Sequence, residues 1–265
     1  MTKANIFSSR LELPKLSARV WKVWRRNFDV FMKTVHVNFL PSVIEPILYL
    51  VAFGFGLGTF VTNIPGGYIR FIASGLIAIS IMQGSFFECT YSSFVRMYYQ
   101  KTFDAIIATP ISVEEVIAGE LLWGATHAAI NSTIVLAVVA AFGLISSPLF
   151  FIVPLLAFMG GLMFAAIGMC FTALAPNIDF FNYPSFLLIT PMFLLSGTFF
   201  PLSLLPSQLQ VAALALPLTH VVNITRALIS GSTENFLLLG IGWIVIAIIV
   251  FFVLSINLMK RRLIR

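Results

Sequence analysis

Long apolar runs separated by short polar stretches dominate the pattern of this chain. Six of these runs hold about 17 to 25 residues or somewhat more, the length a helix needs to cross a hydrocarbon core about 30 Å thick. The pattern predicts an all-α polytopic membrane protein in which residues 1–265 form one transmembrane domain. The six predicted spans are residues 38–61, 71–95, 113–145, 149–175, 183–200 and 235–258.

Residues 16–35 precede the first span and follow a different pattern. Apolar side chains recur there every three or four residues, and charged side chains fill the opposite face. This pattern predicts an amphipathic helix that lies in the membrane interface. A helix packed on a soluble domain is the alternative, and the lack of any remaining soluble domain disfavours it. The apolar positions are Val20, Trp24, Phe28, Phe31 and Val35, and the charged positions are Arg19, Lys22, Arg25, Arg26, Asp29 and Lys33.

Lysine and arginine are concentrated on one side of the predicted spans. Eight of the sixteen precede the first span, two (Arg96 and Lys101) lie between the second and third spans, and four are near the C-terminus. Only Arg70 and Arg226 fall on the other side. Because cytoplasmic loops carry an excess of Lys and Arg, both termini are predicted to be cytoplasmic.

Composition agrees with a membrane protein and disfavours a nucleic-acid partner. Charged residues make up only 10% of the chain, whereas they make up about 25% of a typical soluble domain. The formal net charge of +6 comes from residues that flank helices, and no basic groove with interleaved aromatic residues is visible. Cys89 and Cys170 lie singly inside apolar spans, where cysteines pack as small hydrophobic side chains.

The stretch 97–109 connects the second and third spans and is short, mixed in charge and partly apolar. Lys101 and Asp104 keep it soluble, while three apolar side chains are predicted to form an exposed edge. Pro110 disfavours helical angles at the residue before it and so ends the element. The pattern predicts either a short helix that contacts another protein or a plain loop between spans. The three apolar residues are Phe103, Ile106 and Ile107.

A second helix start is predicted directly after this break. Ser112 followed by Glu115 is a capping box, in which each side chain bonds to the other residue's backbone N–H.

The fifth span is interrupted and followed by several helix breakers, namely Pro191, Gly197, Pro201 and Pro206. Backbone groups freed by such breaks need partners in protein or water, because lipid offers none. A short fifth span followed by an outer re-entrant hairpin fits this constraint and is favoured. An ordinary proline-kinked helix with an external loop is the alternative.

No motif for catalysis or nucleotide binding is visible. The chain contains neither the GxxxxGK(S/T) motif nor the GxSxG motif. Its three histidines are far apart and its aspartates are isolated, so no metal-ligand set is apparent. The sequence therefore predicts a protein that is not an enzyme and holds no cofactor of its own.

The ionisable residues inside the spans are few, and such residues normally face protein or water. Glu45, Glu88 and Glu120 are predicted to lie in the cytoplasmic half. They either line a substrate entry or make polar contacts between helices, and the second is favoured because no cationic partner is evident. Most of the 27 phenylalanines are expected to be lipid-facing bulk, and a subset on the second and fifth spans is predicted to present flat faces to sugar rings or acyl chains. Those assigned to a candidate substrate path are Phe193, Phe199 and Phe200.

Three stretches together resemble the membrane subunits of type-2 ABC exporters, most closely the nodulation-type (NodJ-like) lipooligosaccharide permeases. They are "FDAIIATPISVEEVIAGE", "TPMFLLSGTFFPLSLLP" and "LPLTHVVNITRALISG". The resemblance implies a permease of the bacterial inner membrane that dimerises with a second copy of itself. It also implies two copies of a separate ABC ATPase subunit, which bind ATP and Mg, and export of a lipid-linked saccharide or another amphiphile.

The same resemblance assigns roles to the unusual segments. It implies that 16–35 is the elbow helix, that 97–109 is the coupling helix contacting the ATPase, and that 201–216 is the outer re-entrant segment. An ion-coupled secondary transporter and a membrane-embedded transferase are the rival classes. The first needs an inverted repeat with midplane ion ligands, and the second needs a catalytic cluster; neither is apparent. An exporter of hydrophobic drugs or of polysaccharide is the alternative within the family.

Overall fold

The computed structural model describes residues 13–231 and 236–264, except 57, 59, 60, 62, 63 and 65. Residues 57, 59 and 60 of the first predicted span and residue 235 of the sixth lie outside this part of the chain. Within it every regular element is helical, which confirms the all-α membrane fold. The helices are α1 Val20–Gly56, α2 Tyr68–Phe87, α3 Thr102–Ile107, α4 Val113–Ala141, α5 Val153–Leu174, α6 Asn182–Pro184, α7 Thr190–Leu195, α8 Ser207–Ala215, α9 Pro217–Ser230 and α10 Phe236–Leu263.

Five helical stretches among the described residues are long and apolar enough to cross a membrane. Two further helix pairs pass the same test together but are bent, by 56° in α1 and by 89° between α8 and α9. The number of spans is therefore five to seven, and six stays a prediction. It treats the second half of α1 as a span and assigns 201–216, which contains α8 but not α9, to the re-entrant segment. The five stretches are Tyr68–Tyr99, Val113–Ala141, Pro148–Leu174, Ile178–Leu195 and Leu238–Leu263.

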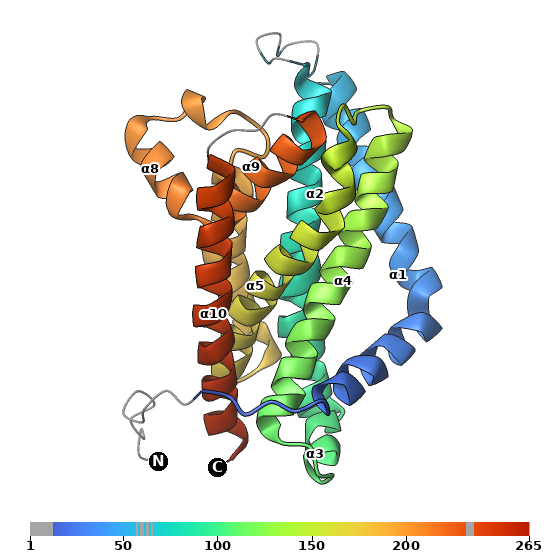
Figure 1. Cartoon of the computed structure of the whole chain (residues 1–265), viewed down its shortest axis with the longest axis vertical. Coiled ribbons are helices and arrows are strands. Elements are labelled where there is room, and N and C mark those ends of the chain that lie inside the picture. Colours follow the sequence, from blue (N-terminus) through green and yellow to red (C-terminus); the bar gives the residue numbers. More distant parts are fainter. Residues whose placement is uncertain are drawn as a thin grey trace.

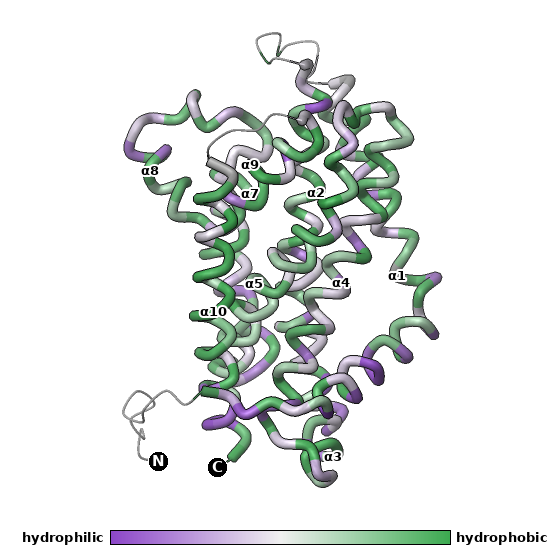
Figure 2. The backbone as a smooth tube through the Cα atoms, in the orientation of Figure 1, coloured by the Kyte–Doolittle hydropathy of each residue, from purple (hydrophilic) through white to green (hydrophobic). Residues whose placement is uncertain are grey.

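The two ends of the molecule differ in the elements they carry (Figure 1). Helix α3, the first half of α1 and the C-terminal end of α10 lie together at one end, and α8 and α9 lie at the other. We call these the α3 end and the α8 end. Hydrophilic residues gather at the α3 end, while α10 and α5 are predominantly hydrophobic along the middle (Figure 2).

The centre of the fold is a close contact between α4 and α5. A Cβ atom added at Gly161 would lie 2.8 Å from the Cβ of Ala128 and 3.2 Å from the Cα of Ala125. Only glycine leaves room for such an approach, and small residues are the usual means of bringing membrane helices together.

The predicted interfacial helix over 16–35 corresponds to the first half of α1, which begins at Val20 and continues into the first apolar segment after the bend. It is packed on α4. The indole of Trp24 donates to the hydroxyl of Thr126 at 2.9 Å. Val23 occupies the space at Gly119, where an added Cβ would lie 2.6 Å from the Cβ of Val23.

The helical stretch that begins with α2 runs to Tyr99, four residues beyond the predicted end of the second span. Lys101 then adopts φ 56°, a left-handed conformation that separates this helix from α3. The short helix therefore begins at Thr102 rather than at residue 97. The capping box before α4 is confirmed, because both reciprocal bonds between Ser112 and Glu115 are present.

Candidate functional site

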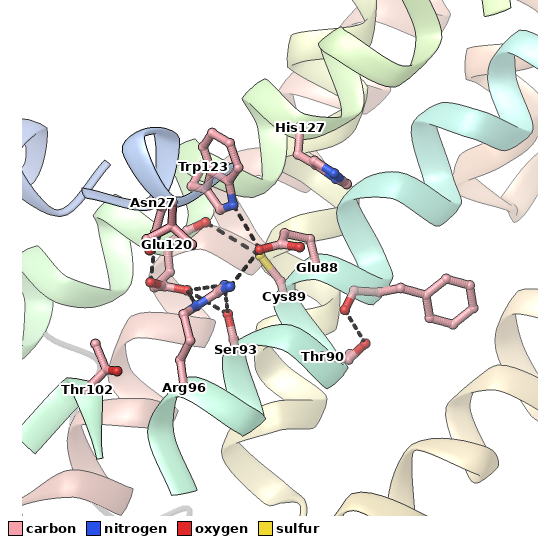
Figure 3. A network of polar contacts seen from close by, with 12 residues as sticks. Asn27, Glu88, Cys89, Thr90, Ser93, Arg96, Thr102, Glu120, Trp123 and His127 are labelled. Carbon is pink, nitrogen blue, oxygen red and sulfur yellow. Dashed lines mark hydrogen bonds and ion pairs between the residues drawn. The ribbon is translucent and has the colours of Figure 1, made fainter. Parts of the chain in front are cut away.

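A buried ion-pair cluster lies near the α3 end, between α4 and the continuation of α2 (Figure 3). The Nη1 atom of Arg96 is 2.8 Å from Oε1 of Glu88, and its Nη2 atom is 2.6 Å from Oε2 of Glu120. The Glu120 side chain has no exposed surface, and those of Arg96 and Glu88 are only 14% and 12% exposed. One largely buried guanidinium therefore bridges two carboxylates.

Neighbouring side chains donate further hydrogen bonds to both carboxylates. Asn27 from α1 donates its Nδ2 to Oε1 of Glu120 at 2.7 Å, and Ser93 donates its hydroxyl to Oε2 at 2.8 Å. The Trp123 indole donates to Oε1 of Glu88 at 2.8 Å. A buried ion pair is tolerated when its other polar atoms are hydrogen-bonded in this way. The cluster thus ties the first half of α1 to α2 and α4.

The backbone that carries this cluster is irregular. Glu88 begins one π-helical turn, Glu88–Ser92, and Arg96 lies in a second, Val95–Tyr99. Such turns are rare and occur mostly at functional sites, because the widened helix changes where side chains project.

Sequence reasoning found both carboxylates but missed their cation. Arg96 was counted among the loop charges that set the orientation, whereas it lies inside the helix and pairs with Glu88 and Glu120. Its spacing was the available signal: Arg96 follows Glu88 by eight residues, which is about two helical turns and therefore roughly the same face.

A cavity of about 590 Å³ opens beside the cluster, between the first half of α1, the α2 stretch and α4. Its wall combines charged, amide and aromatic side chains, so it offers hydrogen bonds and flat apolar faces together. Glu120 does not line it but lies behind Arg96. The charged, amide and aromatic side chains of the wall include Arg26, Gln83, Glu88, Arg96, Trp123 and His127.

A second cavity, of about 220 Å³, adjoins the first and shares Gln83, Gly84 and Phe87 with it. Glu45 and Asn131 contribute its polar wall. Glu45 and Glu88 therefore lie in two neighbouring cavities.

An aromatic row leads from the smaller cavity toward the segment after α7. Tyr49 lines that cavity and stacks on Phe53 with ring centroids 5.8 Å apart. Phe53 lies 5.4 Å from the ring of Phe199, which lies 4.9 Å from that of Phe193. The predicted aromatic residues are thus separated from the carboxylates by two further rings, and half-buried Phe200 is not part of the row.

Helix α3 lies close to the larger cavity. Arg26 lines the cavity, and its Nη2 atom is 3.5 Å from the hydroxyl of Thr102, the first residue of α3. On α3 itself Lys101 and Asp104 are exposed, as expected for a soluble segment.

The expected apolar edge of α3 needs one correction. Phe103 has no exposed surface and belongs to the hydrophobic cluster at the α3 end, which also contains Phe94, Val116 and Phe181. A six-residue helix lying on α4 has to insert its largest apolar side chain to be held in place. Only Ile106 and Ile107, both partly buried, are left to form the edge. They pack against the same cluster.

The site offers noncovalent contacts. Within the part of the chain that the structure describes, no group of three His, Cys, Asp or Glu side chains is placed to hold a metal ion. The cluster and the cavities supply charge, hydrogen bonds and ring faces along one side of the helix bundle.

The chain is similar in sequence to a known protein family and to proteins of known name. Residues 18–230 match the family model described as ABC-2 type transporter. Nodulation protein J of Rhizobium meliloti (strain 1021) is 37% identical over 259 residues, which cover 96% of this chain and 98% of the relative. Nodulation protein J of Rhizobium leguminosarum bv. viciae is 38% identical over 245 residues, covering 92% and 94%.

A more distant relative carries a transport name. The inner membrane transport permease YadH of Escherichia coli (strain K12) is 24% identical over 240 residues, covering 90% of this chain and 93% of the relative. No solved structure matches the chain. The family match and the two nodulation proteins cover most of the membrane helices described above. The chain therefore belongs to the ABC-2 type transporter family, as a multi-pass transport permease subunit of a bacterial membrane.

Proposed function

We propose that this chain is the membrane-spanning permease of an ATP-driven exporter that moves a lipid-linked saccharide, or a similar amphiphile, outward across the inner membrane. Two copies of the chain form the pore with two copies of a separate ABC ATPase subunit, which bind ATP and Mg. The α3 end faces the cytoplasm, and α3 is the coupling helix that contacts the ATPase. The two permease halves move as rigid bodies to alternate access.

One observation carries this proposal: the lining of the larger cavity extends to Gln100, two residues before the start of α3. Arg26 lines the cavity and also reaches Thr102 at the start of α3. Arg26 therefore links the wall of the cavity to the first residue of the proposed coupling helix.

The make-up of the cavities favours an amphiphile with a saccharide head. Gln83, Glu88 and His127 supply hydrogen-bonding groups for hydroxyls, and Trp123 supplies an aromatic face. The volume of about 590 Å³ lies within the range of roughly 300–1,000 Å³ seen for small-molecule sites, which suits a head group. A purely apolar drug would leave these polar groups without partners, and a long polysaccharide would need a continuous channel.

Purification of the complex tests the partner. We expect this chain, extracted from its native membrane in mild detergent, to bring an ABC ATPase with it. Recovery of the permease without any ATPase, together with cargo uptake driven by an ion gradient, would favour a secondary transporter.

The cargo is tested by ATP hydrolysis in the reconstituted complex. We expect acylated oligosaccharides to stimulate hydrolysis, and Glu88→Ala to reduce this stimulation more than the basal rate, because Glu88 lines the cavity. Glu88→Gln, which keeps an acceptor for Trp123, should be milder. Glu114→Ala is the matched control, since Glu114 pairs with Lys260 away from the cavity. Stimulation by apolar drugs but not by glycolipids would contradict the cargo class.

Orientation is tested with single cysteines and an impermeant maleimide. Cysteines at Lys101 and Arg262 should react only from the cytoplasmic side, and one at Arg70 only from outside, because Lys and Arg are concentrated at the α3 end. Lys3 and Asn63 are equivalent reporter positions, but they lie outside the described residues. Labelling of position 101 from outside would reverse the topology.

A further inference from the structure

Arg226 joins three separate elements at the α8 end. It lies on α9, and its Nη2 donates to the carbonyl oxygen of Gly197, in the turn after α7, at 2.8 Å. Its Nε donates to the hydroxyl of Ser74 on α2 at 3.2 Å, and its guanidinium carbon lies 3.8 Å from the ring centroid of Phe71. No other cation among the described residues connects elements at this end of the molecule.

Arg226 is unusual in having no counter-ion among the described residues. Among the described residues no carboxylate lies within ion-pair distance of it, in contrast to Arg96, which has two. A guanidinium carries five N–H donors, and the structure assigns protein acceptors to two of those of Arg226. The guanidinium of Arg226 is therefore only partly hydrogen-bonded by the described residues.

The turn that Arg226 holds is incompletely satisfied as well. Gly197 adopts φ 73°, in the left-handed region that favours glycine. The hydroxyls of Ser196 and Thr198 on either side of it are buried and have no hydrogen-bond partner among the described protein groups. Buried polar groups almost always have hydrogen-bond partners. Two unpaired hydroxyls beside a guanidinium that has no described counter-ion therefore need a physical explanation.

The same turn rests directly on α2. A Cβ atom added at Gly75 would lie 2.6 Å from Cγ2 of Thr198 and 2.9 Å from its carbonyl oxygen. Glycine at this position therefore lets the turn approach the helix backbone. The turn fits closely against α2 in shape, but its polar groups are only partly hydrogen-bonded. This combination suits a contact that is made in one state of the protein and broken in another.

We infer that Arg226 is the positioning residue of a latch that fastens the turn Ser196–Thr198 to α2 and releases it during the transport cycle. On release, both hydroxyls and the guanidinium gain water as a hydrogen-bond partner, which offsets the lost contacts. Assigning the latch to the outer exit rests on the proposed function. The existence of the latch does not depend on that function, because release of the turn can be measured without any cargo.

The first test uses Thr198→Cys as a reporter, with Cys89 and Cys170 replaced by alanine. Thr198 has no exposed surface, so an impermeant maleimide should label position 198 slowly in the resting protein. Arg226→Gln should raise this rate about tenfold or more, since it removes hydrogen bonds to a charged donor. Arg226→Lys should give a smaller rise, because it keeps the charge. Thr219→Cys, equally buried on α9, is the control against general unfolding.

ATP turnover by the reconstituted complex with its ATPase should also accelerate labelling at position 198. If neither turnover nor Arg226→Gln changes the rate at position 198, or if both reporters respond alike, the latch is overturned. An effect of Arg226→Gln in a chain that recruits no ATPase would uphold the latch while refuting the exporter.

The second comparison separates a latch from a permanent fastening. In a complex that contains the ATPase and keeps Arg226, ATP turnover should raise the labelling rate at position 198. If turnover leaves that rate unchanged while Arg226→Gln raises it, the turn never leaves α2 during the cycle and the latch is overturned.

Discussion

Arg96→Met is expected to destabilise the protein by about 3–5 kcal/mol, the cost of leaving buried charge without its partner. Glu88 and Glu120 both depend on this one guanidinium, and Glu120 has no exposed surface through which water could replace it. The loss also removes a link between helices, because Asn27 of α1 bonds to Glu120. We therefore expect a much lower unfolding midpoint in detergent and looser docking of α1 on α4.

Removing the carboxylate charges together with the cation should restore much of this stability. The triple variant Arg96→Met, Glu88→Gln, Glu120→Gln leaves no unpaired charge, and replacing a whole buried ion cluster is often nearly neutral. Lys260→Met is the matched control: its pair with Glu114 is 33% and 13% exposed, so its loss should cost about 1 kcal/mol or less. If the triple variant is as unstable as Arg96→Met, then Arg96 stabilises the fold through its packing and not through its charge.

The fold was largely predictable because each span is a long apolar block between breaks. Pro110 and the Ser112–Glu115 capping box fixed the start of α4 within a residue of the observed Val113. The end of the second span was less predictable. The π-helical turns that carry the helix on to Tyr99 have no sequence signature, since they depend on packing against other helices.

The candidate site was predictable only in part. Glu45 and Glu88 were identified because ionisable residues in apolar spans are rare, and both do line cavities. Arg96 was missed because a basic residue near a span end is normally a flanking charge. Tyr49 and Phe53, which connect the smaller cavity to Phe199, were indistinguishable by sequence from lipid-facing aromatic residues.

Phe103→Ala should produce the second large effect, a loss of about 3–5 kcal/mol in stability, typical of truncating a fully buried phenylalanine. Phe103 is the side chain that anchors α3 in the hydrophobic cluster at the α3 end. The variant is therefore expected to lose ATPase association indirectly, because α3 no longer keeps its position.

The partly exposed isoleucines should behave differently. Ile106→Ala with Ile107→Ala removes apolar surface from the proposed interface while Phe103 stays in place. We expect ATPase binding about tenfold weaker or more, the effect of losing roughly 1.4 kcal/mol of contact energy, with a smaller change in unfolding midpoint than for Phe103→Ala. Asp104→Lys alters the exposed surface of α3 without touching packing and reports on charge alone.

Two measurements on each variant distinguish residues that hold α3 in place from residues that contact the ATPase. They are the unfolding midpoint of the isolated permease and the amount of ATPase that co-purifies with it. Phe103→Ala should lower both values. The isoleucine pair should lower the second far more than the first. If the isoleucine pair co-purifies with normal amounts of ATPase and transports normally, α3 is not the coupling helix. The ATPase must then bind another surface at the α3 end, where the first half of α1 and the end of α10 also lie.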